Sequence, residues 1–379
     1  MSTERIVIVG AGLAGGNAAV ELREQGFSGP VTVLGAEQHP PYERPPLSKG
    51  MLLGEEDAAD TLVEPDAWWA EHDVDLRTGV EVAGIDTAAR QVQLADGPLE
   101  YASLILATGS EPRTLPALAE AGIASTPLRT LEQSRRIVDA LRPGAKVAIV
   151  GAGWIGLEVA AAARNAEAQV SVFEQAPLPL LGVLGPEVAS LFADLHRAHD
   201  VDLRLGTAVS PQELAGHDLV VVGIGAAPRT GLAEAAGLGV SNGVLVDEQL
   251  RTGDPHVLAA GDIANHLHPR FGRIRVEHWD NAREQGRVAA RNALAGPGAG
   301  EVYDRVPYFF TDQYDLGMEY VGHVGAEGYD RVDLEGDTDL AAGGALRAFW
   351  VRDGEVVAAM QANDWDYSEE LRSVVGSRR

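Results

Sequence analysis

Short hydrophobic runs alternate with glycine-rich turns along this chain. Ile6–Val9 and Val147–Val150 are two such runs, and a Gly-x-Gly-x-x-Gly turn follows each of them. A helix-forming stretch comes next in both places, and a second hydrophobic run, Val31–Leu34 or Val170–Phe173, closes the pattern. Strand, glycine turn, helix and strand in this order are typical of a βαβ unit with a parallel sheet. The pattern predicts an α/β fold with two Rossmann-like dinucleotide-binding units.

The remaining pattern predicts the segments between and after these units. Residues 78–101 alternate like antiparallel strands around an Asp-Gly turn, and residues 277–294 read as a loop running into a helix. The proline-dense segment 40–49 is predicted to be extended and non-helical, either facing a ligand or serving as an exposed linker. Alternating strands and a short helix near 368–375 predict a C-terminal α+β domain over 304–379.

The two glycine motifs and the changes in pattern predict four segments. Residues 1–110 and 240–303 are expected to form the first and second parts of one dinucleotide-binding domain. Residues 111–239 are expected to form a second dinucleotide-binding domain between them, and the C-terminal domain follows.

Charge and cysteine content narrow the function classes. The formal net charge of -26 argues against nucleic-acid partners and against binding to anionic membranes, because both need basic surfaces. Complete absence of cysteine excludes disulfides, thiolate metal sites and cysteine nucleophiles. Without a signal peptide or a transmembrane run, a cytoplasmic location is expected.

The glycines of the first motif have distinct physical roles. Gly10 permits the tight turn, Gly12 lets backbone N–H groups approach a pyrophosphate, and Gly15 lets the helix pack on the strand. Glu37 follows the second strand and is placed to accept hydrogen bonds from an adenosine ribose. The alternative is a glycine turn that binds nothing.

The second motif repeats the argument and predicts a coenzyme preference. Its glycines are Gly151, Gly153 and Gly156, and Glu174 ends the second strand. A carboxylate there accepts a ribose hydroxyl and repels a 2′-phosphate, so NADH is expected over NADPH. Glu158 follows the last glycine; it is either a solvated acid at the helix start or a contact of the nicotinamide end.

Other groups of residues give weaker indications of function. His256, His266 and His268 lack a nearby acid at ligand spacing, so no metal site is expected. A hydrolase triad is not expected either. Asp262, read alone, could cap a helix from Ile263 onward.

Several longer motifs resemble one family. The chain is similar over nearly its whole length to the FAD-dependent ferredoxin reductases of bacterial oxygenase systems. The most specific match is Pro41-Tyr-Glu-Arg-Pro-Pro-Leu-Ser-Lys49. Further matches are Leu106–Arg113, Leu128–Thr130, Gly223–Pro228, Ala260–Ala264, Glu277–Ala282 and Val306–Tyr314.

The resemblance implies cofactor contacts residue by residue. Lys49 would lie near the reacting edge of the flavin, and with Glu158 it is the candidate catalytic pair. Asp262 would bind the ribityl chain, with Thr108 and Gly109 beside the flavin. Residues 1–110 and 240–303 would thus form the FAD-binding domain, and residues 111–239 the NAD-binding domain. The remaining implied or adjoining contacts with FAD or NAD are Ala14, Arg44, Val82, Ala107, Arg129, Ile155, Gly225, Gly261 and Trp279.

The implied reaction is electron transfer from NADH through FAD to a [2Fe–2S] ferredoxin serving an oxygenase, by a monomer or weak homodimer. Alternatives are rubredoxin or another acceptor, or an NADH-binding signalling flavoprotein like apoptosis-inducing factor. The chain departs from the family at Ala36, where relatives carry an acid, and over 207–217, where a hairpin is expected to be missing. Docking of an acidic ferredoxin needs local basic residues; candidates are Arg270, Arg273, Arg275 and Arg305.

Overall fold

The computed structural model describes residues 5–379, which divide into two compact units. Unit 1 contains the residues up to 44, 59–111 and 227–307; unit 2 contains 45–58, 112–226 and 308–379. The chain passes from one unit to the other five times, and two of these passages lie in short strands, β8 (Ser110–Pro112) and β13 (Ala226–Pro228). The predicted division into FAD, NAD and C-terminal domains is a functional one and stays a prediction.

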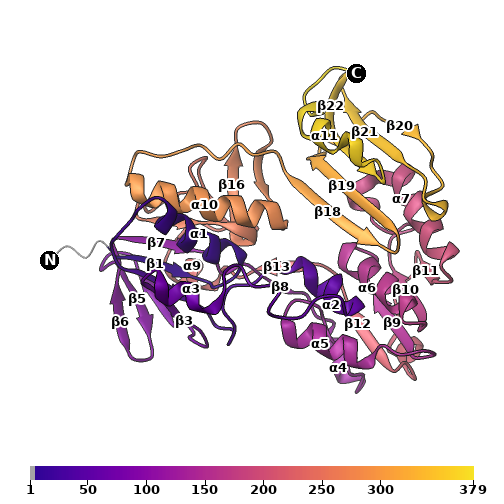
Figure 1. The fold of residues 1–379 in the computed structure, drawn as a ribbon, viewed down its shortest axis with the longest axis horizontal. Coiled ribbons are helices and arrows are strands. Elements are labelled where there is room, and N and C mark those ends of the chain that lie inside the picture. Colours follow the sequence, from indigo (N-terminus) through magenta and orange to yellow (C-terminus); the bar gives the residue numbers. More distant parts are fainter. Residues whose placement is uncertain (1–4) are drawn as a thin grey trace. The chain divides into compact units, whose positions relative to one another are not determined.

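Unit 1 is built on a parallel sheet in the order β15-β7-β1-β2-β3 (Figure 1). Its strands are β1 (Ile6–Val9), β2 (Val31–Leu34), β3 (Val74–Arg77), β7 (Ser103–Leu106) and β15 (Val257–Ala259). Almost every residue of β1, β2, β7 and β15 is buried, which is why these strands read as continuous hydrophobic runs. The predicted Rossmann-like unit is confirmed here.

Smaller elements surround this sheet. An antiparallel sheet contains β4 (Gly84–Asp86), β5 (Gln91–Leu94) and β6 (Gly97–Glu100), as the alternation predicted. A second contains β14 (Val244–Val246), β16 (Ala264–His268) and β17 (Gly272–Arg275). The helices are α1 (Leu13–Glu24), α3 (Asp66–Glu71), α9 (Gly231–Ala235), α10 (Trp279–Ala295) and a 3₁₀ turn over Gly261–Ile263.

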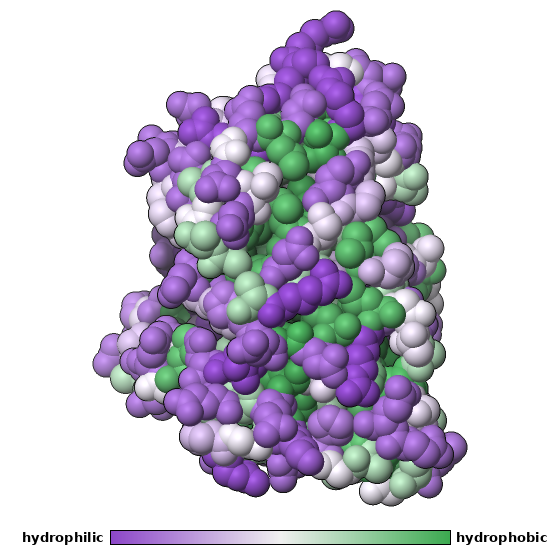
Figure 2. All heavy atoms as spheres, turned by 90° about the vertical axis from the view of Figure 1, so that its right-hand side faces the viewer, coloured by the Kyte–Doolittle hydropathy of each residue, from purple (hydrophilic) through white to green (hydrophobic). Residues whose placement is uncertain are grey.

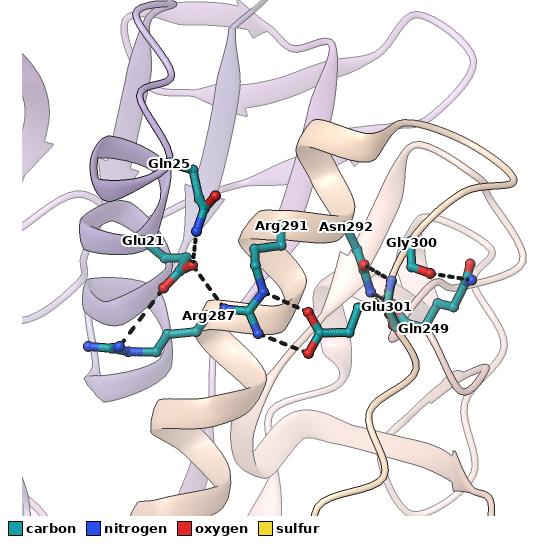
Figure 3. A network of polar contacts seen from close by, with 8 residues as sticks. All are labelled: Glu21, Gln25, Gln249, Arg287, Arg291, Asn292, Gly300 and Glu301. Atoms are coloured by element: carbon teal, nitrogen blue, oxygen red, sulfur yellow. Dashed lines mark hydrogen bonds and ion pairs between the residues drawn. The ribbon is translucent and has the colours of Figure 1, made fainter.

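Helices α1 and α10 lie side by side and approach closely (Figure 1). Gly286 of α10 makes this possible, because a Cβ added there would lie 2.2 Å from the carbonyl oxygen of Ala14 in α1. A charged network also joins them (Figure 3). The carboxylate of Glu21, only 4% exposed, lies 2.9 Å from the guanidinium of Arg291 and 3.9 Å from that of Arg287.

The same network reaches the segment that follows α10. Arg291 also binds Glu301 at 2.7 Å, and its two carboxylate partners raise its pKa. The side chain of Asn292 donates to the carbonyl oxygens of Gln249 and Glu301 (Figure 3). The side chains of Gln249 and Arg251 donate to the carbonyl oxygens of Gly300 and Gly296, so they hold the stretch 296–300, which has no helix or strand of its own, to unit 1.

Unit 2 contains a second parallel sheet, in the order β11-β10-β9-β12. The strands are β9 (Lys146–Val150), β10 (Gln169–Glu174), β11 (Asp202–Leu205) and β12 (Leu219–Val222). The helices around it are α2 (Gly50–Leu53), α4 (Pro116–Glu120), α5 (Leu131–Ala140), α6 (Trp154–Asn165), α7 (Leu181–Ala198) and α8 (Pro211–Leu214). Between β11 and β12 there is only α8, with no hairpin, as expected for residues 207–217.

The rest of unit 2 is an antiparallel sheet in the order β18-β19-β22-β21-β20. Its strands are β18 (Tyr308–Gln313), β19 (Leu316–Gly322), β20 (Arg331–Gly336), β21 (Leu346–Arg352) and β22 (Glu355–Ala362). Two 3₁₀ turns, Leu340–Ala342 and Trp365–Tyr367, and α11 (Ser368–Val374) accompany it. The predicted strands and short helix of the C-terminal segment are confirmed.

One local prediction is wrong. Pro45–Ser48, within the segment expected to exclude helix, forms a 3₁₀ helix, and α2 follows it directly. Proline is disfavoured inside a helix because it lacks an N–H, but the first turn of a helix needs no such donor. Pro45 and Pro46 occupy that first turn, so their fixed φ angle starts this helix instead of preventing it.

Candidate functional site

The first glycine motif forms a tight cradle in unit 1. Gly10 has a φ of +114°, and a Cβ added to it would lie 2.1 Å from the carbonyl oxygen of Ala107. A Cβ on Gly15 would lie 1.9 Å from the carbonyl oxygen of Gly10, whereas one on Gly12 would meet nothing within 4 Å. Gly10 and Gly15 therefore pack directly against backbone atoms, while the space beside Gly12 is free. This arrangement fits a pyrophosphate approaching the N-terminus of α1.

The structure brings Gly261 and Asp262 to the same cradle. A Cβ on Gly261 would lie 3.0 Å from the Cβ of Ala14, and the N–H of Gly261 donates to Gln285. Asp262 is buried and accepts a hydrogen bond of 2.7 Å from Ser110, which directly follows the Thr108–Gly109 turn. Asp262 thus lies in a 3₁₀ turn and does not cap a longer helix.

Glu37, predicted to bind a ribose, already has two partners from the proline-rich segment. Arg44 binds one carboxylate oxygen at 2.9 Å, and the hydroxyl of Tyr42 donates to the other at 2.5 Å. The sequence gives Glu37 and Arg44 as separate candidates, but in the fold they form an ion pair just after β2. Of the other predicted residues of unit 1, Val82 packs against the hydrophobic core, and Trp279 begins α10 with Arg283 over its ring.

The second glycine motif forms an equivalent cradle in unit 2. Gly151 has a φ of +103°, and its added Cβ would lie 2.3 Å from the carbonyl oxygen of Gly223. A Cβ on Gly156 would lie 2.1 Å from the carbonyl oxygen of Gly151, and one on Gly153 would again meet nothing within 4 Å. This agreement with the first cradle fits a second dinucleotide, whose pyrophosphate would face the N-terminus of α6.

Glu174 does more than its predicted role requires. Its carboxylate accepts hydrogen bonds of 2.8 Å from the backbone N–H groups of Ala152 and Ala176. Ala152 lies between the first two glycines, so Glu174 holds the glycine turn in place. Each oxygen retains a lone pair for a ribose hydroxyl.

The other predicted residues of unit 2 lie at the start of α6, after β12 and before α5. Ile155 is 40% exposed at the start of α6, and Gly225 accepts a backbone hydrogen bond from Arg113. Arg129 directly precedes Thr130, whose hydroxyl and Gln133 form the capping box of α5.

Glu158 and Lys49 meet in unit 2, although they are far apart in the sequence. The Lys49 ammonium lies 2.6 Å from one Glu158 oxygen, and Ser48 donates to the other at 2.5 Å. Thr311 of β18 donates at 2.5 Å to the oxygen that also binds Lys49. We call these four residues the Glu158 cluster. Glu158 is 5% exposed, so of the two alternatives for this residue the solvated acid at the helix start is wrong.

The physical reason lies in the position of Glu158 on α6. It lies one turn beyond the first turn of the helix, on the side that faces residues 45–48 and β18. A buried carboxylate needs charged or hydrogen-bonding partners, and three donors supply them here. Neither Ser48 nor Thr311 was predicted as a site residue; only the paired Ser-Lys sequence before α2 could have indicated one of them.

The histidines have structural surroundings. Within residues 5–379, no group of three His, Asp or Glu side chains is arranged to hold a metal ion. His266 is buried beside Gln285, and burial lowers its pKa to about 4. None of the helices in the same stretch is both long and apolar enough to cross a membrane.

Comparison with known proteins agrees with this geometry. Residues 4–286 match the model of the pyridine nucleotide-disulphide oxidoreductase family. The chain belongs to this family. Since it has no cysteine, it lacks the redox disulfide to which the family name refers. Members of the family bind FAD and NAD, and the two cradles described above fit these two cofactors.

Several relatives resemble the chain over nearly its full length. The ferredoxin--NAD(+) reductase component of the anthranilate 1,2-dioxygenase system of Burkholderia cepacia is 39% identical, covering 96% of this chain and 92% of the relative. Putidaredoxin reductase of Pseudomonas putida is 37% identical, covering 88% and 83%. In a crystal structure, putidaredoxin reductase in covalent complex with putidaredoxin superimposes with a TM-score of 0.90 at 32% identity, over 99% of this chain and 94% of that one.

Proposed function

We propose that this protein is an FAD-dependent NADH:ferredoxin reductase that supplies electrons to an oxygenase. The observation that carries the proposal is the presence of two glycine cradles with the same geometry, one in each unit, in a chain without cysteine. Two dinucleotides and no protein disulfide require that electrons pass directly between bound cofactors. The full-length similarity to ferredoxin reductase components of oxygenase systems supports ferredoxin as the acceptor.

The balance of the reaction is simple. One NADH and two oxidised ferredoxins give NAD⁺, one proton and two reduced ferredoxins. A bound flavin supplies the conversion between a two-electron donor and one-electron acceptors. In unit 1, the open side of Gly12 and the buried carboxylate of Asp262 would hold FAD. In unit 2, the open side of Gly153 and the carboxylate of Glu174 would hold NADH.

The Glu158 cluster is the candidate for positioning charge at the reacting centre. Lys49 is the only cation in the cluster, and its ammonium also lies 5.3 Å from the centre of the Phe310 ring. Bound to Glu158 and an aromatic face, Lys49 has a fixed position, which is what electrostatic stabilisation of a reduced cofactor requires.

The arginines proposed for ferredoxin docking have intramolecular partners. Arg305 binds the buried carboxylate of Asp280 at 2.6 Å, and Arg273 donates to the backbone carbonyls of Val246 and Asn265. Arg275 pairs with Glu277. These contacts make Arg305 a support of the fold, so the docking surface stays a prediction. The face in Figure 2 is mostly hydrophilic, with hydrophobic residues between the polar groups.

An absorbance spectrum, followed by addition of NADH and then of electron acceptors, tests this function. The purified protein should show a flavin band, and NADH added without oxygen should bleach it within the mixing time of a rapid experiment. Oxidised putidaredoxin and a rubredoxin are then added separately, with ferricyanide as a control acceptor. A colourless protein, or a flavin that NADH does not reduce, would overturn the proposal. If rubredoxin is reduced and putidaredoxin is not, the acceptor is a rubredoxin and not a ferredoxin.

A further inference from the structure

A line of polar side chains, buried except for the half-buried last one, leads away from the Glu158 cluster inside unit 2. Thr311, which donates to Glu158, accepts from the side-chain amide of Gln313 at 3.2 Å. The amide oxygen of Gln313 lies 2.9 Å from Nε2 of His196, and Nδ1 of His196 lies 3.0 Å from the hydroxyl of Tyr314. We call Thr311, Gln313, His196 and Tyr314 the donor chain.

The sequence shows why these residues share one interior. Thr311 and Gln313 are two positions apart on β18, so they project from the same face of the strand, which is the buried one. His196 lies near the end of α7 and is fully buried. Hydrophobic side chains at these positions would have filled the same space without leaving any polar atom to satisfy. The polar side chains therefore call for an explanation other than packing.

The Glu158 carboxylate, at one end of the donor chain, fixes the direction of every hydrogen bond along it. A carboxylate only accepts, so the Thr311 hydroxyl must donate to Glu158 and can only accept from Gln313. Gln313 therefore directs its amide N–H groups toward Thr311 and its oxygen toward His196. This oxygen requires a proton on Nε2 of His196, which leaves Nδ1 as the acceptor for Tyr314.

The surroundings keep His196 neutral, as this direction requires. Burial lowers the pKa of His196 to about 4, which outweighs the opposite effect of the hydrogen bond with Gln313. At the outer end, the ring of His199 stacks on Tyr314 with centroids 3.6 Å apart. Burial also raises the pKa of Tyr314, although the nearby Arg164 acts against the rise, so the phenol keeps its proton.

We propose that Gln313, His196 and Tyr314 are positioning residues of the reductase, because their one-way donor chain aligns Thr311 and so fixes the Glu158 carboxylate beside Lys49. The inference rests on the proposed function, in which this cluster lies at the reacting centre. Aligned donors polarise one another, so each member strengthens the bond at the carboxylate. Changes at Tyr314 should therefore reach Lys49 through side chains that touch no cofactor.

The first test reads the proton on His196 in the intact flavoprotein. Nitrogen-15 imidazole spectra should show His196 as the Nε2–H tautomer, with the signal assigned by its loss in His196→Gln. Thr311→Val keeps the side-chain volume but removes the hydroxyl that orients Gln313, so both tautomers should appear. Thr311→Ser keeps the hydroxyl and should keep the single tautomer. An unchanged tautomer in Thr311→Val overturns the proposal, because a packing role would not depend on the hydroxyl.

The second test measures the reduction of the bound flavin by NADH in rapid mixing. Tyr314→Phe and Gln313→Leu should slow this step by roughly three- to tenfold. The matched controls are Tyr329→Phe, which removes a hydroxyl bonded to Glu187, and Gln361→Leu, which removes a buried amide bonded to Glu319. Both controls lie in unit 2 outside the donor chain and should keep the wild-type rate.

The outcomes separate this inference from the proposed function. Wild-type protein that NADH does not reduce contradicts the function, while the tautomer experiment still tests the direction of the chain. Wild-type protein that is reduced normally, with unchanged rates in Tyr314→Phe and Gln313→Leu, overturns the positioning role. Slower reduction in the controls as well as in the chain variants would also overturn it, since the effect would then be general.

Discussion

At the scale of single residues, the fold assigns roles that the sequence could only suggest. The glycines of both motifs were identified correctly because one residue type alone tolerates their geometry: a Cβ on Gly10 or Gly151 would clash with a backbone carbonyl. The roles of charged residues are harder to predict from the sequence, because their partners are distant in it. Glu158 is held by Ser48, Lys49 and Thr311, and no local pattern indicates that meeting.

Asp262 provides a test of the first cradle. Replacing Asp262 with Ala should leave much of the purified protein without flavin, because a buried hydrogen-bond acceptor for the cofactor is lost. The ratio of flavin to protein absorbance measures this occupancy. Asp333→Ala, at a partly exposed acid of β20, is the control and should stay fully yellow. Full flavin content in Asp262→Ala would remove the reason for assigning this residue to the cofactor.

The coenzyme preference is best tested next to Glu174 and not at it. Removing the Glu174 carboxylate would also release the N–H groups of Ala152 and Ala176. Gln175 is exposed, so Gln175→Arg adds a cation for a 2′-phosphate and leaves these bonds intact. The ratio of kcat/KM for NADH over NADPH should fall by roughly tenfold, or about 1.4 kcal/mol. Equal use of both coenzymes by the wild type would show that Glu174 has been misinterpreted.

At the scale of helices and strands, the sequence predicted most elements of both parallel sheets. Continuous hydrophobic runs and glycine turns carry that signal directly. The 3₁₀ helix at Pro45–Ser48 goes against the general preference of proline, which disfavours a helix interior but is compatible with the first turn. Contacts between helices, such as Glu21 with Arg291, involve residues about 270 positions apart and leave no periodic signal.

The contact between α1 and α10 depends on the buried charge of Glu21. Arg291→Met should lower the free energy of unfolding by about 3 kcal/mol, because the buried Glu21 carboxylate then keeps the neutral amide of Gln25 and only the more distant Arg287 as a cation. Urea unfolding measures the change. Arg331→Met breaks a partly exposed pair with Asp333 and should cost less than about 1 kcal/mol. Similar losses in the two variants would contradict the role given to the network.

His196, buried near the end of α7, should make the stability of the fold depend on pH. The pKa of His196 is lowered to about 4 from 6.5, so the unfolded state binds more protons within this window and stability falls as pH decreases through it. Between about pH 7.5 and 5, the contribution lost is on the order of 2 kcal/mol. His196→Gln should reduce the shift of the urea midpoint over this range, whereas His72→Gln, at an exposed histidine, should not. Identical shifts in His196→Gln and wild type would mean that His196 is protonated in the fold.

At the scale of the whole molecule, charge is the dominant feature. A net charge of -26 repels an acidic ferredoxin at long range, while close ion pairs in a complex are screened less. Moderate salt should therefore raise the second-order rate of ferredoxin reduction, and only high salt should lower it. A rate that falls steadily from the lowest salt would indicate a basic docking surface strong enough to outweigh the net charge.

The central claim is that NADH reduces a bound flavin that then serves two ferredoxins in succession. Anaerobic stopped-flow mixing tests this most directly: flavin absorbance follows the first step, and the [2Fe–2S] absorbance of putidaredoxin follows the second. The predicted result is rapid loss of the flavin band, followed by reduction of two ferredoxins for each NADH consumed. A flavin that NADH reduces but that no ferredoxin reoxidises, at any salt concentration, would contradict the claim.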